Sequence, residues 1–322
     1  MTTRRRARGV IAALIASVAL AGACRDDNGS PTARQPQASS STTRSVAADP
    51  VKGKVVVAVA DLVCSDAQAE ATRGSAARCR SEETAAVAKS LSPDAVLFAG
   101  DIQYDRGSKS EFATFERSGW ASFKDITFPA PGNHEYATPN AAPYFDSFGA
   151  RAGPRGRGYY SAEVGTWHVV SLNSNCKPAG GCTPGSPQEQ WLRRDLAAAA
   201  EADRKCTVAF WHHARLSSGY HGPDESMEAI WAALADANAD VVVVGHDHHY
   251  ERFAPERGVR QFVAGTGGRS LYPTLGAARG SEVRNSATFG VLELRLGDGE
   301  YAWKFHGIPG TTFTDSGRDR CR

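Results

Sequence analysis

Residues 240–252 have the sequence Asp-Val-Val-Val-Val-Gly-His-Asp-His-His-Tyr-Glu-Arg. The four valines at 241–244 are typical of a strand that is buried on both faces. Gly245 ends this strand, and two imidazoles one residue apart, those of His246 and His248, follow it. In an extended loop, side chains at positions i and i+2 point the same way, so both rings can reach one volume. This spacing indicates a metal site at the end of a strand rather than two packed core histidines.

Four other apolar runs end in polar side chains in the same way. These runs lie at 55–60, 95–99, 126–130 and 206–211. The polar side chains that the five runs release are Asp61, Asp101, Tyr104, Asn133, His212, His246 and His248. Ligands of open α/β sheets bind beyond the carboxyl ends of the parallel strands, and gathering so many polar groups there without a metal would be costly. The sequence therefore predicts a metal centre at this edge of the sheet.

Helical patterns separate several of the apolar runs, which predicts an α/β domain. A helix is expected over 81–91 with Ser81 as its N-cap. Another helix is expected to begin at Ser186, where Glu189 completes a capping box. A third helix is expected over 224–237.

The remaining patterns predict structure rather than chemistry. Residues 166–172 alternate like a strand, so His168 is expected to be structural. Residues 261–305 alternate in shorter strands with turn signals, which predicts that they form a second sheet. The Gly-Thr-Gly-Gly stretch at 265–268 could cradle a phosphate, but no helical pattern follows it, which favours a tight turn.

The charge composition gives no indication of a nucleic-acid-binding face. The chain has 322 residues, of which 41% are hydrophobic and 22% charged, an ordinary globular balance. The formal net charge of +2 includes four arginines within residues 4–8, and without them the remainder carries −2. We therefore expect no nucleic-acid partner.

The N-terminal segment has the anatomy of an export signal. Residues 1–23 combine a basic start with a short apolar run and small residues, which predicts a signal peptide. The stretch at 20–24 resembles a bacterial lipobox, so Cys24 is the predicted site of lipidation and of a membrane anchor. Simple cleavage after Ala23 and twin-arginine export are the alternatives. Each route predicts an exported protein, secreted or held on the extracellular face of the cell membrane.

The predicted mature chain has two parts. Residues 24–51 are rich in Ser, Thr, Pro, Ala and Gln, a composition that predicts a disordered tether. Residues 52–322 are expected to form one catalytic domain.

Six cysteines remain once Cys24 is set aside, and an even number in an exported chain indicates disulfides. A structural zinc site is disfavoured because the chain lacks a Cys-x-x-Cys pair. Sequence alone leaves the connectivity open. Nearest-neighbour pairing would join Cys64 to Cys79, Cys176 to Cys182, and Cys206 to Cys321.

The strand-end motifs carry a resemblance to a known family. Their order is Asp, Gly-Asp-x-x-Tyr, Gly-Asn-His-Glu, His and Gly-His-x-His. This order resembles the calcineurin-like metallophosphoesterases and, within them, the purple acid phosphatases, over residues 54–253. The resemblance implies a four-layer α-β-β-α sandwich with two metal ions at the C-terminal ends of the strands.

The resemblance also implies a role for each polar residue. The implied ligands are Asp61, Tyr104 and His248 for one ion, Asn133, His212 and His246 for the other, and Asp101 for both. Many relatives carry His two residues after the first Asp, where this chain has Val63. A phenolate from Tyr104 suits Fe(III), so we expect Fe(III) paired with Fe(II), Zn(II) or Mn(II).

Two departures from the family pattern stand near the predicted ligands. Ala60 replaces a Gly that often precedes the first Asp, and Ala214 replaces the Pro usual two residues after the fourth-motif His. The second departure leaves His213 as an alternative ligand to His212, which we prefer. Adjacent side chains point apart in extended backbone, so His213 and His249 are expected to have supporting or surface roles.

The expected function is that of an exported phosphatase acting on small phosphomonoesters. Two metal ions about 3.5–4 Å apart can clamp a phosphoryl group and generate hydroxide near neutral pH for in-line attack. His134 and His221 are the candidates to protonate the leaving alkoxide. The alternatives are a phosphodiesterase or nucleotidase of the same superfamily, or a non-catalytic phosphate- or metal-binding surface lipoprotein.

Overall fold

A computed structural model of the chain describes residues 51–75, 78–204 and 206–322. The predicted signal peptide, Cys24 and nearly all of the predicted tether lie outside the described residues. The described residues form one compact unit. Within the described part of the chain, no helix has the length and hydropathy needed to cross a membrane.

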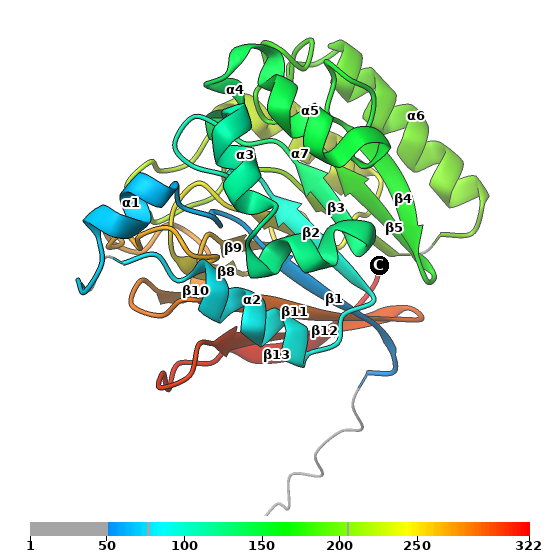
Figure 1. Ribbon diagram of the computed structural model, residues 1–322. Coiled ribbons are helices and arrows are strands. Elements are labelled where there is room, and N and C mark those ends of the chain that lie inside the picture. The colour runs from blue at the N-terminus through cyan, green and yellow to red at the C-terminus, as the bar shows by residue number, and fades with distance from the viewer. Residues whose placement is uncertain (1–50, 76–77, 205) are drawn as a thin grey trace, which may run out of the picture. The chain divides into compact units, whose positions relative to one another are not determined.

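The first of two β-sheets has six strands (Figure 1). In order across the sheet they are β13 (Ser316–Arg320), β12 (Glu300–Gly307), β11 (Gly290–Gly297), β1 (Gly53–Val59), β2 (Ala95–Ala99) and β3 (Thr127–Ala130). The three strands β1, β2 and β3 run parallel, while β11 pairs antiparallel with β1. The carboxyl ends of β1, β2 and β3 therefore meet at one edge of the sheet.

The second sheet has seven strands. In order they are β10 (Ser281–Asn285), β8 (Tyr250–Phe253), β9 (Arg260–Ala264), β7 (Val241–Val244), β6 (Cys206–Phe210), β5 (Trp167–Ser171) and β4 (Tyr160–Val164). The four strands β5, β6, β7 and β9 are parallel. Thus β6 and β7 also end at a common edge.

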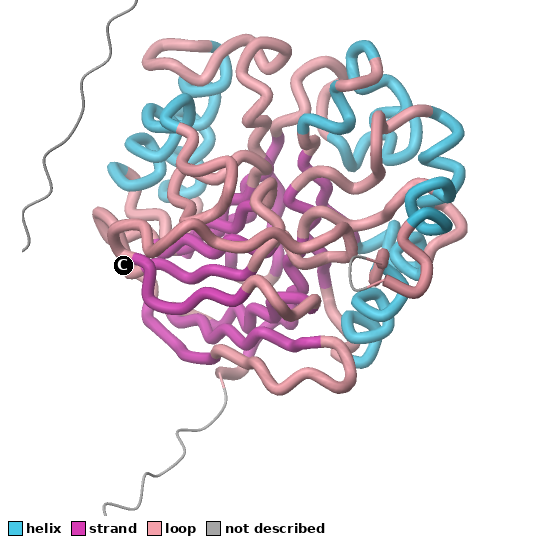
Figure 2. Tube along the Cα trace, turned by 90° about the vertical axis from the view of Figure 1, so that its left-hand side faces the viewer, coloured by secondary structure: helices cyan, strands magenta, loops and turns pink. Residues whose placement is uncertain are grey.

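Helices cover the outer face of each sheet (Figures 1 and 2). The first sheet packs against α2 (Ser81–Ser90), α3 (Lys109–Phe115), the 3-10 helix η1 (Gly119–Ile126) and α5 (Ala142–Phe148). The second packs against α6 (Pro187–Glu201) and α7 (Glu228–Asp236). The remaining helices are α1 (Asp66–Ala71), α4 (Asn133–Tyr136) and the 3-10 turns η2 (Pro139–Ala141), η3 (Gly149–Ala152) and η4 (Glu225–Met227).

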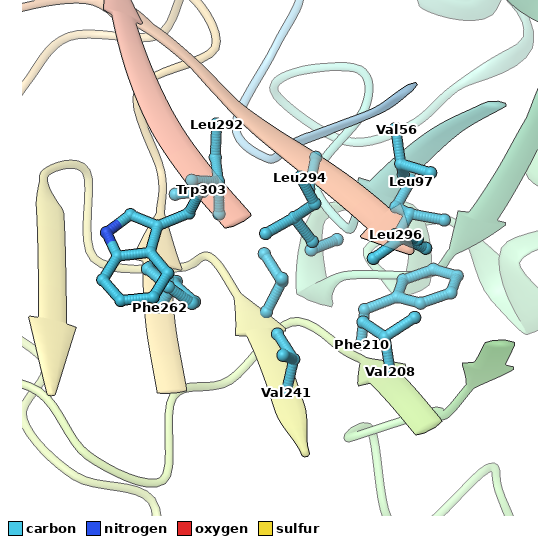
Figure 3. Packing of buried hydrophobic residues seen from close by; sticks show 14 of the residues in the cluster. Val56, Leu97, Val208, Phe210, Val241, Phe262, Leu292, Leu294, Leu296 and Trp303 are labelled. Atoms are coloured by element: carbon cyan, nitrogen blue, oxygen red, sulfur yellow. The ribbon is translucent and has the colours of Figure 1, made fainter. Parts of the chain in front are cut away.

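Successive residues of the central strands pack into different layers of the fold. In β1, Val56 packs between the two sheets whereas Val57 packs under the helices, because successive side chains of a strand point to opposite faces. Leucines of β11 meet Phe210 and Val241 of the second sheet in the inner core (Figure 3). Burial on both faces explains the uninterrupted apolar runs, and the fold is the predicted four-layer sandwich.

The sequence pattern predicted that the C-terminal strands form a second sheet of their own, and this prediction is wrong. β11, β12 and β13 extend the first sheet through antiparallel pairing of β11 with β1. β9 and β10 belong instead to the second sheet. Which sheet a short strand joins depends on contacts with partners far away in sequence, and the local pattern contains no information about them.

Two predicted helix caps are wrong in detail. The N-cap of α2 is Arg80 rather than Ser81, because the carbonyl of Arg80 accepts the first helical hydrogen bond, from the Thr84 N–H at 3.0 Å. Ser186 is the N-cap of α6 but its side chain makes no cap bond. The capping box fails because Glu189 accepts a hydrogen bond from the Gly185 N–H at 3.0 Å instead.

Three disulfides join Cys64 to Cys79, Cys176 to Cys182, and Cys206 to Cys321. This is the nearest-neighbour pairing, one of the connectivities that the sequence left open. Such bonds persist in oxidising compartments, so their presence is consistent with an exported protein.

Candidate metal centre

The polar residues that follow the five strands lie together in one cluster. Asp61 follows β1, Asp101 follows β2, Asn133 follows β3, His212 follows β6, and His246 follows β7. Tyr104 and His248 join them from the same loops. All seven side chains singled out from the sequence are therefore found at one place.

The backbone turns sharply at three of these positions. Asp61, Asp101 and His246 have φ values of 63°, 49° and 70°, in the left-handed region that non-glycine residues rarely occupy. The loop after β7 is therefore not extended, contrary to the sequence-based assumption. Such strain persists only where the surroundings fix the backbone, and it concentrates at functional sites.

Close approach explains the glycine that precedes the histidines. A Cβ on Gly245 would lie 2.3 Å from the Cβ of Ala60 and 2.7 Å from Oδ2 of Asp61. Any side chain at this position would push the end of β7 away from the end of β1. The glycine thus lets strands of the two sheets bring their terminal residues into contact.

The Tyr104 hydroxyl is the meeting point of one half of the cluster. It lies 2.7 Å from Oδ1 of Asp61, 3.1 Å from Oδ2 of Asp101 and 3.0 Å from Nε2 of His248. Nε2 of His248 is also 3.2 Å from Oδ1 of Asp61. A phenol has one proton to donate, so it cannot satisfy all three neighbours at once.

Nε2 of His212 is the meeting point of the other half. It lies 3.1 Å from Oδ2 of Asp101, 3.1 Å from Oδ1 of Asn133 and 3.2 Å from Nδ1 of His246. The same oxygen of Asp101 therefore faces both halves. His246 and His248 reach different halves, although one residue separates them.

The Nδ1 atoms of His212 and His248 indicate what the two halves of the cluster can bind. Nδ1 of His212 lies 2.9 Å from the carbonyl of Ala99, and Nδ1 of His248 lies 2.6 Å from the carbonyl of Ser270. Each Nδ1 therefore donates its proton to a carbonyl, which leaves Nε2 of the neutral ring with a lone pair. Lone pairs of imidazole, carboxylate and amide groups thus converge, and this donor set fits two bound cations.

The ionisation of the cluster without metal is consistent with this fit. Burial would raise the pKa of Asp101, but the charge and hydrogen bond of His212 hold it well below its usual range. Burial would lower the pKa of His212, yet Asp101 raises it to about 9. Burial and the charges of Asp101 and Asp61 raise the pKa of Tyr104 well above its ordinary value. A bound cation would replace the protons that His212 and Tyr104 otherwise hold.

One side of the cluster is more open than the other. Asp61, Asp101, Tyr104, His212 and His248 are each at most 2% exposed. In contrast, Asn133 and His246 are partly exposed. A ligand would therefore approach from the side of Asn133 and His246.

Glu135 organises the loop after β2, a role that the sequence did not reveal. Its fully buried carboxylate accepts hydrogen bonds from the backbone N–H groups of Asp101, Ile102, Gln103 and Gly132, at 2.7 to 3.3 Å. Burial and the charge of Asp101 raise the pKa of Glu135 to about 7. The last residue of the Gly-Asn-His-Glu motif thus fixes the position of Asp101.

The two predicted proton donors both lie at the edge of the cluster. Nε2 of His134 is 3.7 Å from Oδ2 of Asp101, and its side chain is 30% exposed. The His134 ring also lies 4.3 Å from the ring of Tyr104. His221 is exposed, and its ring centroid lies 4.2 Å from that of His246.

The two neighbouring histidines lie in different surroundings. It is His212 that contacts Asp101, whereas His213 bonds to the hydroxyl of Ser174 at 2.8 Å. The His213 ring nevertheless lies 4.5 Å from that of His246, so it supports the cluster. His249 is fully buried and bonds to Glu251 at 3.0 Å, so a surface role for it is wrong.

Residues 269–272 complete one wall of the centre and were missed in the sequence. Tyr272 stacks on His248 with ring centroids 4.1 Å apart and planes 12° apart. The Arg269 guanidinium lies 5.5 Å from the ring centroid of Tyr104. No motif marks these residues, and only the Gly-Thr-Gly-Gly turn before them hinted at a close approach to the centre.

The comparison with known families explains this arrangement. Residues 56–250 match the calcineurin-like phosphoesterase family. The chain belongs to this family. The matched region contains every member of the cluster, and family membership implies two metal ions.

Relatives within the family include purple acid phosphatases. Purple acid phosphatase 22 of Arabidopsis thaliana is 31% identical over 258 residues, covering 66% of this chain and 54% of that protein. An uncharacterized protein of Mycobacterium tuberculosis is 31% identical over 185 residues, covering 50% of this chain and 35% of its own. The chain thus spans roughly a third to a half of these curated relatives.

A solved structure shows the same fold. The purple acid phosphatase from yellow lupin (Lupinus luteus) seeds superposes with a TM-score of 0.68 at 18% identity, covering 84% of this chain and 54% of that one. The phosphoesterase fold of this chain is thereby established independently of the motifs.

Proposed function

We propose that this chain is an exported phosphatase that hydrolyses small phosphomonoesters with the help of two metal ions. One observation carries the proposal: two groups of buried donors meet at a shared carboxylate oxygen of Asp101. Tyr104 contacts this oxygen from one side and His212 from the other. A shared carboxylate is the arrangement that holds two ions close enough to act on one phosphoryl group.

The donors divide between the two proposed ions as the contacts do. Asp61, Tyr104 and His248 would hold one ion, Asn133, His212 and His246 the other, and Asp101 both. When bound, two such ions supply positive charge that stabilises the negative charge developing on the phosphoryl group, and they supply the activated water that attacks it. The phenolate of Tyr104 favours Fe(III) for the first ion, and Fe(II), Zn(II) or Mn(II) would occupy the second position.

The residues of the open side would orient the ester. Asn133 and His246 are the partly exposed members of the donor set, so the phosphoryl group would enter beside them. His134 and His221 flank that side and would deliver a proton to the departing oxygen. The backbone N–H of His221 donates to Oδ1 of Asp247 at 2.9 Å, which fixes the loop that carries this ring.

Export and anchoring rest on the N-terminal sequence and the disulfides. A basic start, an apolar run and Cys24 favour a lipid anchor after signal removal. Mass spectrometry of the protein from membranes should find a diacylglyceryl group on Cys24. A protein released into the medium with an unmodified Cys24 would rule the anchor out.

Substrate comparison and metal analysis test the proposed activity. We expect purified protein to hydrolyse p-nitrophenyl phosphate faster than bis-p-nitrophenyl phosphate or AMP, and to contain two metal ions per chain. A tyrosinate-to-Fe(III) absorption band should disappear in Tyr104→Phe. Preference for the diester or for AMP would instead indicate a phosphodiesterase or nucleotidase, and metal-loaded protein inert on all three would indicate a non-catalytic binding protein.

Leaving-group dependence tests the role of His221. His221→Ala should lower kcat on alkyl phosphates by about 10²-fold or more, since general acid catalysis contributes about 10²- to 10⁴-fold. The loss on p-nitrophenyl phosphate should be much smaller, because p-nitrophenolate leaves without a proton. An equal loss on both esters would contradict proton donation by this residue.

A further inference from the structure

Two loops at the open side of the metal centre carry exposed apolar side chains. Across residues 51–75, 78–204 and 206–322, the exposed large hydrophobic side chains are Tyr220 and Leu275, each 70% exposed. A single exposed hydrophobic residue is ordinary. Here both such residues lie on loops 217–222 and 270–276, which border the same centre.

Aromatic contacts connect these loops to the donor residues. The His221 ring lies 4.2 Å from that of His246 and 5.4 Å from that of Tyr220. On the other loop, Tyr272 stacks on His248 and lies 5.9 Å from His221. The surface next to the open side of the centre is therefore aromatic.

Hydrogen bonds fix the two loops to one another. The Leu275 N–H donates to the carbonyl of Ser218 at 2.8 Å, and the Ala278 N–H donates to the hydroxyl of Ser218 at 2.7 Å. Ser218 in turn donates through its N–H to Glu251 at 2.9 Å. Glu251 is fully buried, so both loops are tied to the core of the domain.

A second buried carboxylate ties the first loop to the donor residues. Asp247, between His246 and His248, accepts hydrogen bonds from the Ser217 hydroxyl and from the His221 N–H. A Cβ on Gly219 would lie 2.2 Å from Cγ of Asp247, so the loop lies directly against this carboxylate. Tyr220 thus stays exposed on a backbone that is held on both sides.

We propose that Tyr220 and Leu275 form a subsite for the organic group of the ester and favour a planar aromatic ring there. This inference rests on the proposed phosphatase function and names the class of substrate. With the phosphoryl group beside Asn133 and His246, the organic group extends past His221 toward these two loops. An aromatic ring gains both apolar burial and ring stacking on a tyrosine.

Binding of inert phosphonates tests the subsite without relying on turnover. Phenylphosphonate and methylphosphonate share the charged group and differ in the ring, so calorimetry on the metal-loaded full chain compares their Kd values. Tyr220→Ala should weaken phenylphosphonate binding about three- to tenfold and change methylphosphonate binding by less than about twofold. Leu275→Ala should have a smaller effect in the same direction.

Matched variants separate ring contact from loop damage. Tyr220→Phe keeps the ring and should bind both phosphonates like the native protein. Pro223→Ala changes an exposed residue of the same loop region and should do the same. These controls show whether any loss in Tyr220→Ala comes from the missing ring.

Three results would overturn the inference. They are an equal loss for both phosphonates in Tyr220→Ala, no loss for either, and a native dimer that Tyr220→Ala converts to monomers in sedimentation. The last would make this face an interface between copies. If the protein hydrolyses no ester, the phosphonate comparison still gives its answer, so failure of the subsite and failure of the proposed function are distinguishable.

Discussion

Two buried histidines of the second sheet invite comparison, because their surroundings look alike at first. His168 lies within β5, and His212 follows the neighbouring strand β6. Both are at most 4% exposed, both contact carboxylates, and both have a raised pKa despite burial. A shifted pKa beside a carboxylate therefore does not by itself distinguish the proposed metal ligand from a structural residue.

The two histidines differ in how many polar atoms each ring nitrogen faces. Nδ1 and Nε2 of His168 each face one carboxylate, Glu163 at 3.0 Å and Asp195 at 2.8 Å, so its protonated ring is fully satisfied. His212 uses Nδ1 on a backbone carbonyl and directs Nε2 at three polar atoms. His168, inside β5, meets one carboxylate from the neighbouring strand β4 and one from α6, whereas His212, just past the end of β6, meets polar groups that follow three other strands.

Metal removal should produce the largest effect. Dialysis against a chelator should lower phosphatase activity by about 10³-fold or more, because the ions contribute several kcal/mol to the transition state. Activity should return when ions are added back, with protein-bound metal measured in parallel. Full activity in metal-free protein would contradict a metal-binding role for His212 and leave it no different from His168.

Exchanging each histidine for glutamine should sharpen the comparison directly. His212→Gln should lower kcat/KM by about 10²- to 10³-fold and reduce the amount of bound metal. Loss of a group that only supports a metal ligand lowers metal affinity or activity about 10- to 100-fold, and loss of a ligand itself should lower them further. His168→Gln is the matched control and should keep both metal and kcat/KM near native values. Similar losses in the two variants would contradict the assignment of His212.

A smaller effect is expected from Glu135→Gln. An amide cannot accept from four N–H groups as a carboxylate does, so the loop carrying Asp101 should loosen. Metal affinity, measured by competition with a chelator, should fall about 10- to 100-fold. Glu293→Gln changes a buried carboxylate of β11 that bonds to His306, and it should leave metal affinity unchanged.

The smallest effect concerns stability and pH. Burial lowers the pKa of His168, but the hydrogen bonds to Asp195 and Glu163 outweigh burial and raise it. The stabilisation from the protonated ring is therefore full below the unfolded pKa near 6.5 and disappears as pH rises through the folded pKa. His168→Gln should cost about 1 kcal/mol in the free energy of unfolding at pH 6 and less at pH 9. Urea titrations at the two pH values measure this difference. If the loss in the free energy of unfolding instead grew with pH, a stabilising ion pair of protonated His168 would be contradicted.

The sequence predicted the parts of the centre that depend on strand ends. Val241–Val244 and the apolar run before Asp101 are strands because they are buried on both faces, and each places its next polar residue at the shared edge. The separation of His246 from His248 came from the family resemblance. Local reasoning about an extended loop failed there, because His246 has a positive φ.

The sequence could not predict what depends on distant contacts. Glu135 looks like any helix-start acid until the loop after β2 folds over it. The stack of Tyr272 on His248 joins a strand end to a loop more than twenty residues later, with no periodic signal between them. The pairing of β11 with β1 depends in the same way on a partner at the other end of the domain.

The disulfide between Cys206 and Cys321 has a consequence for the topology of the chain. It closes a covalent ring between two cysteines 115 positions apart in the sequence, and His212, His246 and His248 all lie inside that ring. The oxygen donors Asp61, Asp101, Tyr104 and Asn133 all precede it. In the proposed assignment, each bound ion would therefore take its nitrogen ligands from this ring and its oxygen ligands from the segment that precedes it. Ions bound as proposed would therefore cross-link the ring to the preceding segment, and we expect the metal-loaded protein to unfold more slowly than the metal-free protein.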